Sequence, residues 1–137
     1  MGVALLDTNV YVNLWERRVA EDAVAKIHET FVVRHAAVVL SELRRGARTQ
    51  QAKRTVEALH RMAAEIWEPS AADWWSAGKV VRDVGDERGW DIQKRREFQN
   101  DVLLALTVRG RGALLITGNQ ADFRLLERRL ALRVQYV

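Results

Sequence analysis

Short apolar runs alternate along the chain with longer stretches in which apolar residues return every three or four positions. Short apolar runs are typical of buried strands, and the wider spacing is typical of helices with one apolar face. The predicted strands cover residues 3–6, 31–33, 66–67, 113–116 and 132–137. The predicted helices cover residues 10–17, 19–30, 36–48, 49–64, 70 to 85 or 89, 93–109 and 119–130. This alternation predicts an α/β fold, with a central, mostly parallel β-sheet flanked by α-helices.

Polar residues that follow two of these strands supply candidate chemistry at one edge of the sheet. Asp7 ends the first strand, and Thr117 follows the strand at residues 113–116. Ligands bind open parallel sheets outside the carboxyl ends of the strands. We therefore expect both residues to lie at the edge of the sheet where a ligand binds.

Two carboxylates stand beside predicted helix starts. Asp7 is followed by Thr8 and Asn9, and each of the three can cap a helix, although only one can occupy the N-cap position. Asp122 falls at the third position of the last helix if Asn119 caps it, where negative charge is favourable with the helix dipole. Both acids therefore have a structural explanation that needs no function.

Two other carboxylates lie along helices, next to apolar positions. Glu42 borders the apolar stripe of its helix, and it can reach solvent or pair with Arg45 or Arg48. Asp101 falls within the apolar face of its helix, where an unpaired carboxylate is costly. A buried ion pair with one of the many arginines is the structural explanation for Asp101.

Taken together, the four acids predict a metal site. They belong to strand ends and helices that can converge, and two unit charges about 4 Å apart repel by about 4 kcal/mol at an effective dielectric constant of about 20. Divalent cations make such a cluster tolerable, and ligands that are all oxygen atoms favour Mg²⁺ or Mn²⁺ over zinc. The three histidines have no metal-motif spacing, so we read them as ordinary helix or loop residues.

Length and composition limit the class of protein. With 137 residues, of which 48% are apolar, we expect a single domain over residues 1–137. No apolar run reaches the roughly 18 residues of a membrane-spanning helix, and the N-terminal run is too short for a signal peptide. The lack of cysteine excludes disulfides and thiolate metal sites. We therefore expect a cytoplasmic protein that does not associate with a membrane.

The formal net charge of +4 allows two interpretations. It is either an ordinary arginine-rich, solvated surface or the sign of a polyanionic partner, and charge alone does not decide between them.

The chain resembles PIN-domain proteins, specifically the VapC-type toxin ribonucleases of bacterial type II toxin–antitoxin systems. The matching stretches are LLDTNVYVN, VVLSELRRGA and QNDVLLALTVRGRGALLITGNQADF, and they follow one another in the family's order over nearly the full length. The resemblance implies a PIN domain spanning residues 1–137. It also implies an endoribonuclease that depends on Mg²⁺ or Mn²⁺, hydrolyses RNA phosphodiester bonds and is the toxin of a toxin–antitoxin pair.

The resemblance also assigns residues to the site. The family's three core acids match Asp7, Glu42 and Asp101. The family pattern T-x-[DN]-x-x-[DN]-F matches Thr117, Asn119, Asp122 and Phe123. Asp122 is taken as the fourth acid, but some family members carry a carboxylate at the position of Asn119. Which of the two is the fourth ligand, and whether one or two metal ions bind, therefore stays open.

Four neighbouring polar residues are expected to support the acids. Thr8 and Thr117 are expected to orient Asp7 or to hold a water molecule, and Asn9 is expected to shape the turn after the first strand. Asn119 is expected to act as a neutral ligand or to orient one.

An RNA substrate must be attracted by basic residues, because a cluster of acids repels it. The candidates for RNA binding are Arg44, Arg45, Arg48, Arg95 and Arg96, with Lys53, Arg54, Lys94, Arg109 and Arg111 as further members of the basic rim. Trp74, Trp75 and Trp90 can stack on bases, although tryptophans more often belong to a core or an interface.

The resemblance further implies a homodimer and a VapB-type antitoxin. The antitoxin is expected to place an amphipathic segment in a groove near the acids, for which the predicted helices 10–17 and 49–64 are plausible walls.

Two other functions compete with this reading. One is a catalytically inactive, PIN-like RNA-binding module. The other is a phosphatase of the HAD type, which is disfavoured because Asn9 stands where that family needs a second aspartate.

Overall fold

The computed structural model describes residues 2–137, which form one sheet of five strands in the order β3-β2-β1-β4-β5. Every neighbouring pair of strands is parallel. The strands are β1 (Val3–Leu6), β2 (Val32–Ala36), β3 (Ile66–Trp67), β4 (Leu114–Thr117) and β5 (Arg133–Tyr136). The helices are α1 (Thr8–Arg17), α2 (Glu21–Thr30), α3 (Ala37–Gly46), α4 (Gln50–Met62), α5 (Ala71–Arg88), α6 (Ile92–Gly110) and α7 (Gln120–Glu127). The predicted α/β class and parallel sheet are confirmed.

Several predicted boundaries are wrong by a few residues. β2 continues to Ala36 instead of ending at residue 33, because it pairs with β1 through Arg34 and then with β3 through His35 and Ala36. α1 begins at Thr8 instead of residue 10, because Asp7 occupies the N-cap position. The last helix ends at Glu127 instead of residue 130, and a turn follows it.

The core lies between the central strands and α6. Leu5 of β1 and Leu115 of β4 are fully buried, as are Phe98 and Val102 of α6. Seven consecutive residues of α6, from Val102 to Val108, are buried, so this helix carries apolar residues around its whole circumference. Asp101 directly precedes this buried stretch, which places the acid at the boundary between the core and the sheet edge.

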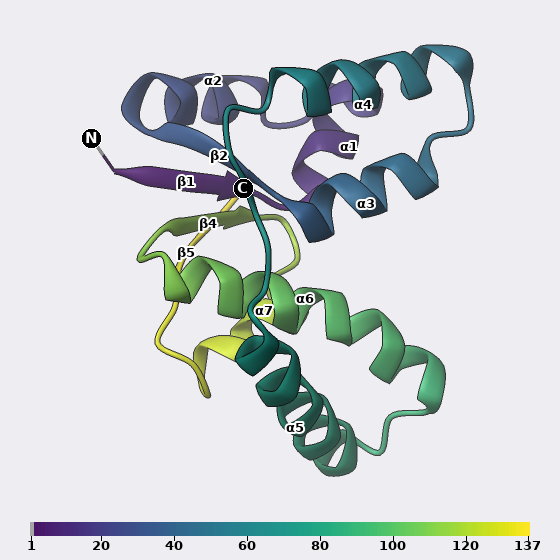
Figure 1. Cartoon of the computed structure of the whole chain (residues 1–137), viewed down its shortest axis with the longest axis vertical. Helices are drawn as coiled ribbons and strands as arrows, with labels where there is room; N and C mark the ends of the chain where they lie inside the picture. Colours follow the sequence, from purple (N-terminus) through teal and green to yellow (C-terminus); the bar gives the residue numbers. More distant parts are fainter. Residues whose placement is uncertain (1) are drawn as a thin grey trace.

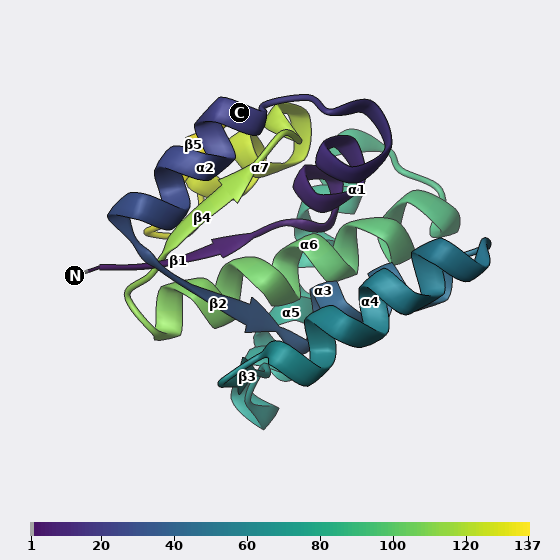
Figure 2. The same ribbon diagram turned by 90° about the horizontal axis from the view of Figure 1, so that it is seen from above.

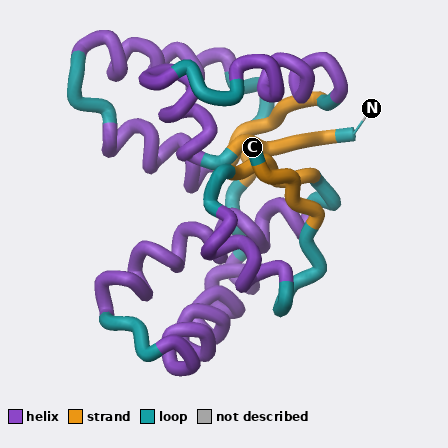
Figure 3. The backbone as a smooth tube through the Cα atoms, turned by 180° about the vertical axis from the view of Figure 1, so that it is seen from behind, coloured by secondary structure: helices purple, strands orange, loops and turns teal. Residues whose placement is uncertain are grey.

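Helices cover the sheet and also extend beyond it. Seen from above, α1 and α2 lie on one side of the strands, and α6 lies on the other with α5 behind it (Figure 2). Two helix pairs, α3–α4 and α5–α6, diverge from the side of the sheet where β1 ends (Figure 1). The view from behind shows the strands gathered opposite these two pairs (Figure 3). Within residues 2–137, no helix has the length and apolar character that crossing a membrane requires.

The register of β1 and β4 places two strand ends side by side. Leu6 pairs with Ile116, so Asp7 and Thr117 are the next residues at the same edge of the sheet. The N–H of Asp7 donates to the carbonyl of Ile116 over 2.9 Å, which extends the ladder by one more bond. The pairing of β1 with β4 therefore fixes the position of the Asp7 backbone.

Candidate functional site

Asp7 is a buried carboxylate at the carboxyl end of β1. Its Oδ1 atom accepts a hydrogen bond of 2.7 Å from the N–H of Thr8. Its Oδ2 atom accepts 2.8 Å from the Thr117 hydroxyl and 3.0 Å from the Asn9 amide. Burial raises the pKa of Asp7, and the hydrogen bonds from Thr117, Thr8 and Asn9 oppose that rise. Three donors therefore hold this carboxylate in one orientation.

Asn9 joins the two strand ends on either side of Asp7. Its Oδ1 atom accepts 2.8 Å from the N–H of Gly118, while its Nδ2 atom donates to Asp7. A Cβ atom at position 118 would lie 3.2 Å from the Asn9 oxygen, which leaves little room for a side chain there. Asn9 thus lies in the first turn of α1, directly after β1, and both Asn9 and Thr117 donate hydrogen bonds to Asp7.

Glu42 on α3 is half-buried and accepts 3.1 Å from the Thr8 hydroxyl. Thr8 therefore bonds to Asp7 through its backbone and to Glu42 through its side chain. Burial raises the pKa of Glu42, and the nearby Asp7 charge raises it further. Neither Arg45 nor Arg48 forms a salt bridge with Glu42 among residues 2–137, although the charge of Arg45 acts in the opposite direction and lowers the pKa of Glu42.

Asp101 on α6 is half-buried at the same sheet edge. Burial raises the pKa of Asp101 to about 9, and the charges of Asp7, Asp122 and Glu42 raise it as well. In the described chain no lysine or arginine forms a salt bridge with Asp101, which excludes the buried ion pair that would have explained it without function. Shared donors link the acids in pairs: Thr8 donates to Asp7 and Glu42, and Asn119 donates to Asp101 and Asp122.

Asp122 occupies the third position of α7, as predicted, with Asn119 as the N-cap. The Asn119 amide donates 3.2 Å to Oδ2 of Asp122 and 3.5 Å to Oδ2 of Asp101. The Asn119 oxygen in turn accepts 3.3 Å from the N–H of Asp122. The structure therefore uses Asn119 to orient the two acids, and its side-chain oxygen is already engaged.

Lys94, which the sequence placed in the basic rim, instead lies within the acid cluster. Its Nζ atom lies 3.1 Å from Oδ1 and 2.9 Å from Oδ2 of Asp122. Lys94 stands seven residues before Asp101 on α6, which is two helical turns along the same face. The seven-residue spacing could have shown that Lys94 and Asp101 share a face of α6. It could not have shown the contact with Asp122, because that residue lies on another helix.

The donor set of the cluster fits a hard divalent cation such as Mg²⁺ or Mn²⁺. It consists of carboxylate oxygens, and Asp7, Glu42 and Asp101 have raised pKa values and no basic partner in a salt bridge among the described residues. Within residues 2–137, no three His, Cys, Asp or Glu side chains stand close enough to hold one metal ion as they lie. The oxygen atoms of the cluster are thus chemically suited to a divalent ion, although the described side chains as they lie do not form a complete metal site.

The basic candidates divide into engaged and free side chains. Arg44 pairs with Glu57 at 3.1 Å. Arg95 donates to the carbonyl of Trp90 and pairs with Asp86 at 2.9 Å. By contrast, the structure records no salt bridge, over residues 2–137, for the remaining candidates, which are exposed: Arg45, Arg48 and Arg96.

The tryptophans also divide. Trp90 packs edge-on against buried Phe98, with ring centroids 4.9 Å apart, and its ring therefore packs against the hydrophobic core. Trp74 and Trp75 are 51% and 87% exposed and line a hollow of about 620 Å³ with Leu106 and Leu130. The exposed pair remains free for contacts with another molecule.

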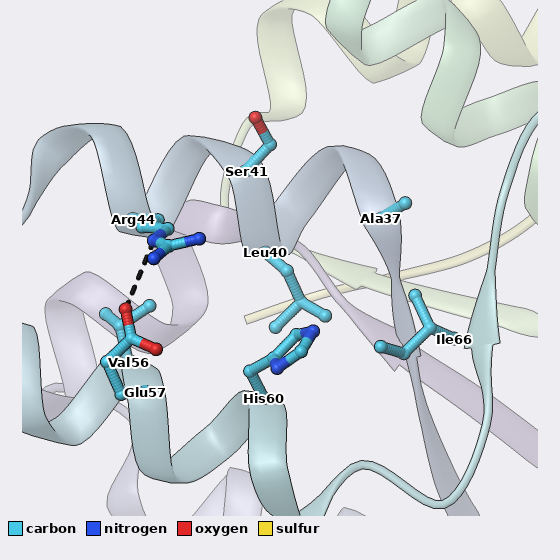
Figure 4. Close-up of a pocket in the computed structure, with 8 residues that line it drawn as sticks. All are labelled: Ala37, Leu40, Ser41, Arg44, Val56, Glu57, His60 and Ile66. Atoms are coloured by element: carbon cyan, nitrogen blue, oxygen red, sulfur yellow. Dashed lines mark ion pairs between the residues drawn. The ribbon is translucent and has the colours of Figure 1, made fainter.

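A second hollow, of about 270 Å³, lies between α3 and α4. Figure 4 shows Leu40 of α3 facing His60 of α4 and Ile66 of β3, while the Arg44–Glu57 pair spans the two helices farther along. The predicted groove walls were helices 10–17 and 49–64. This hollow is bordered by α3 and α4 and none of the four acids lines it, so the groove predicted near the acids stays a prediction.

One family model matches most of the chain. The model of the family described as "PIN domain" matches residues 4–128. No curated protein matches the chain by sequence.

Solved structures with the same fold include three VapBC structures, of which VapBC-5 is described as a member of the VapBC family of toxin–antitoxin systems. VapBC-1 from nontypeable Haemophilus influenzae has a TM-score of 0.71 and 22% identity, over 98% of this chain and 97% of that one. VapBC2 from Rickettsia felis, bound to a DNA fragment from its promoter, has a TM-score of 0.69 and 20% identity, over 98% of both chains. VapBC-5 from Mycobacterium tuberculosis has a TM-score of 0.61 and 21% identity, over 100% of both chains.

Proposed function

Because the chain belongs to the PIN domain family, we propose that it is a metal-dependent endoribonuclease and the toxin of a toxin–antitoxin pair. One observation carries the proposal: half-buried Asp101 lies near Asp7, Glu42 and Asp122, and no basic side chain in the described residues forms a salt bridge with it. A carboxylate in that position is unfavourable in the isolated chain, and a divalent cation would compensate for it.

The roles of the residues follow from their contacts. Asp7, Glu42 and Asp101 would hold a Mg²⁺ or Mn²⁺ ion. When bound, such an ion supplies positive charge to the scissile phosphate and lowers the pKa of a water molecule. Thr117 and Asn9 hold Asp7 in place through its Oδ2 atom, and Thr8 holds Glu42. These fixed hydrogen bonds limit the reorganisation that the acids need in the reaction.

RNA binding would depend on the exposed basic side chains for which residues 2–137 provide no salt bridge. Arg45, Arg48 and Arg96 are exposed, and the net charge of +4 favours a polyanion. Arg44 and Arg95 are weaker candidates, because both are engaged by acids of the protein itself. Binding through such contacts weakens as the salt concentration rises.

The purified chain is expected to cleave RNA only with a divalent ion. The experiment incubates it with total cellular RNA and Mg²⁺ or Mn²⁺, with and without excess EDTA, and maps new RNA ends by sequencing. New ends that appear with the ion and vanish with EDTA support the proposal. Cleavage that persists in EDTA would exclude the metal mechanism, whereas metal-independent binding without cleavage would favour the inactive RNA-binding module.

We further propose a VapB-type antitoxin as the partner, with an amphipathic segment in the hollow between α3 and α4. The solved structures named above are of VapBC proteins, VapBC-5 is described as a member of a family of toxin–antitoxin systems, and the fold of this chain matches theirs. The hollow offers apolar surface from Leu40, Val56 and Ile66 next to the charged Arg44–Glu57 pair. Such a lining suits a helix or strand with one apolar face.

Substitution in that hollow is expected to release the partner. Ile66 is 39% exposed at its rim, so Ile66→Asp adds a charge there at little cost to folding. When the tagged chain is purified from the cells that naturally produce it, a small partner protein should co-purify. The Ile66→Asp substitution should reduce the amount of co-purified partner at least tenfold. Ile92→Asp is the matched control, because Ile92 is exposed and lies outside the hollow. Equal loss in both variants, or a wild type without a partner, would contradict the proposal.

The homodimer implied by the resemblance stays a prediction. Exposed Trp74 and Trp75 are the largest apolar side chains available to such a contact on α5. Sedimentation velocity of the isolated chain decides between monomer and dimer.

A further inference from the structure

A lysine occupies one end of the carboxylate cluster. Lys94 binds both oxygens of Asp122, at 3.1 Å and 2.9 Å. The Asp122 side chain is 12% exposed and the Lys94 side chain 36%, so the pair is partly withdrawn from water. An ion pair in such a place is less screened than one on the open surface. Asp122 is the only one of the four acids with a salt bridge in the described chain.

Local structure holds Lys94 at this position. Asp91 caps α6, and its Oδ1 atom accepts 2.9 Å from the N–H of Lys94, which fixes the first turn of the helix. The Lys94 ammonium lies 5.0 Å from the centre of the Trp90 ring, a favourable cation–π contact. Trp90 in turn packs against Phe98, which is fully buried. The lysine is therefore supported by the core and is not a loose surface chain.

The carboxylates of the cluster differ in what they can still accept. Both oxygens of Asp122 are used by Lys94, and Oδ2 also accepts from Asn119. Among residues 2–137, the one donor recorded for Asp101 is the Asn119 amide, at a long 3.5 Å, and Asp101 also interacts with the Asp122 side chain. An ion that used Asp122 would have to displace Lys94, whereas an ion at Asp101 would meet no competing cation.

We propose that Lys94 is a built-in cation that fills the place of a second divalent ion at Asp122, so that the chain binds one such ion and not two. This inference rests on the proposed function, in which Asp7, Glu42 and Asp101 hold the first ion. Lys94 and one divalent ion together offset most of the charge of the four carboxylates. A second divalent ion would leave the cluster with excess positive charge unless Lys94 withdrew.

Ion stoichiometry tests this role without any measurement of activity. Calorimetric titration of the full chain with Mn²⁺, in the absence of RNA, should give one ion for the wild type and two for Lys94→Gln. Lys79→Gln is the matched control, because Lys79 forms a comparable 3.0 Å pair with Asp83 outside the cluster. The control should bind one ion, as the wild type does.

Lys94→Met is the second variant. It keeps an apolar stem against Trp90 and removes only the charge, and it too should bind two ions. Circular dichroism shows that each variant is folded before titration. Two ions in the wild type, or one ion in both folded Lys94 variants, would overturn the inference while leaving the proposed function intact. If the wild type and the Lys94 variants bind no Mn²⁺ at all, this inference and the proposed metal-dependent function both fail.

Discussion

Asp101→Asn is expected to lower the rate of RNA cleavage by about 10³-fold, which corresponds to about 4 kcal/mol of transition-state stabilisation. The substitution keeps the size of the side chain and removes the charge that would attract a divalent ion. Because Asp101 lies near the other acids, its loss should weaken binding of the proposed metal ion. Cleavage rates are measured on one mapped RNA site at saturating Mn²⁺.

The same variant is expected to be more stable than the wild type in the absence of metal. Burial and the neighbouring acids raise the pKa of Asp101 to about 9. In the unfolded chain the pKa of an aspartate is about 3.9. A raised pKa means that the contribution to stability is fully present below about pH 4 and is lost as the pH rises toward 9. At pH 7 the loss reaches up to about 4 kcal/mol.

Denaturant unfolding in EDTA at pH 5, 7 and 9 measures this effect. The free energy of unfolding of the wild type should fall across the series relative to that of Asp101→Asn, because asparagine does not titrate. Asp22→Asn, a change at an exposed acid on α2, should alter neither cleavage nor this pH dependence. A variant that cleaves at the wild-type rate, or one that is less stable than the wild type at pH 9, would contradict the assignment of Asp101.

The second large effect is stabilisation by the ion itself. Mn²⁺ at about 100 times its dissociation constant should stabilise the wild type by about 2.7 kcal/mol. For a chain of this length, that raises the melting temperature by about 8 °C. The rise should be larger at pH 8 than at pH 5, because an ion must displace the proton that Asp101 holds.

Asp101→Asn provides the internal comparison for this measurement. Its melting temperature should respond to Mn²⁺ by only a small fraction of the wild-type shift. Differential scanning fluorimetry at constant ionic strength separates specific binding from general screening. An equal shift in both proteins would show that the ion binds elsewhere.

Sequence patterns were sufficient for features that depend on local periodicity and on the geometry of parallel sheets. Asp7 follows a short buried strand, and Thr117 follows another, so a parallel arrangement places both at one edge. Asp101 stands out because a carboxylate interrupts an apolar helical face. The α/β class and the convergence of the acids could therefore be predicted before any coordinates.

Features that depend on the packing of one helix against another could not be predicted. Lys94 meets Asp122 only because α6 and α7 pack side by side, and nothing in either segment specifies that contact. Arg95 lies against Gly85, where a Cβ atom would stand 2.8 Å from the guanidinium carbon, so a glycine on α5 admits an arginine from α6. The hollow lies between α3 and α4 for the same reason, since periodicity does not state which helices face each other.

The hydrogen bond between Thr117 and Asp7 joins residues that are 110 positions apart. A ribosome must therefore synthesise β4 before the first acid of the chain meets the hydroxyl that orients it, and α7 must follow before Asp122 arrives. An incomplete polypeptide emerging during translation lacks part of the cluster. On the proposed function, the acid cluster is complete only when synthesis of the chain is nearly finished.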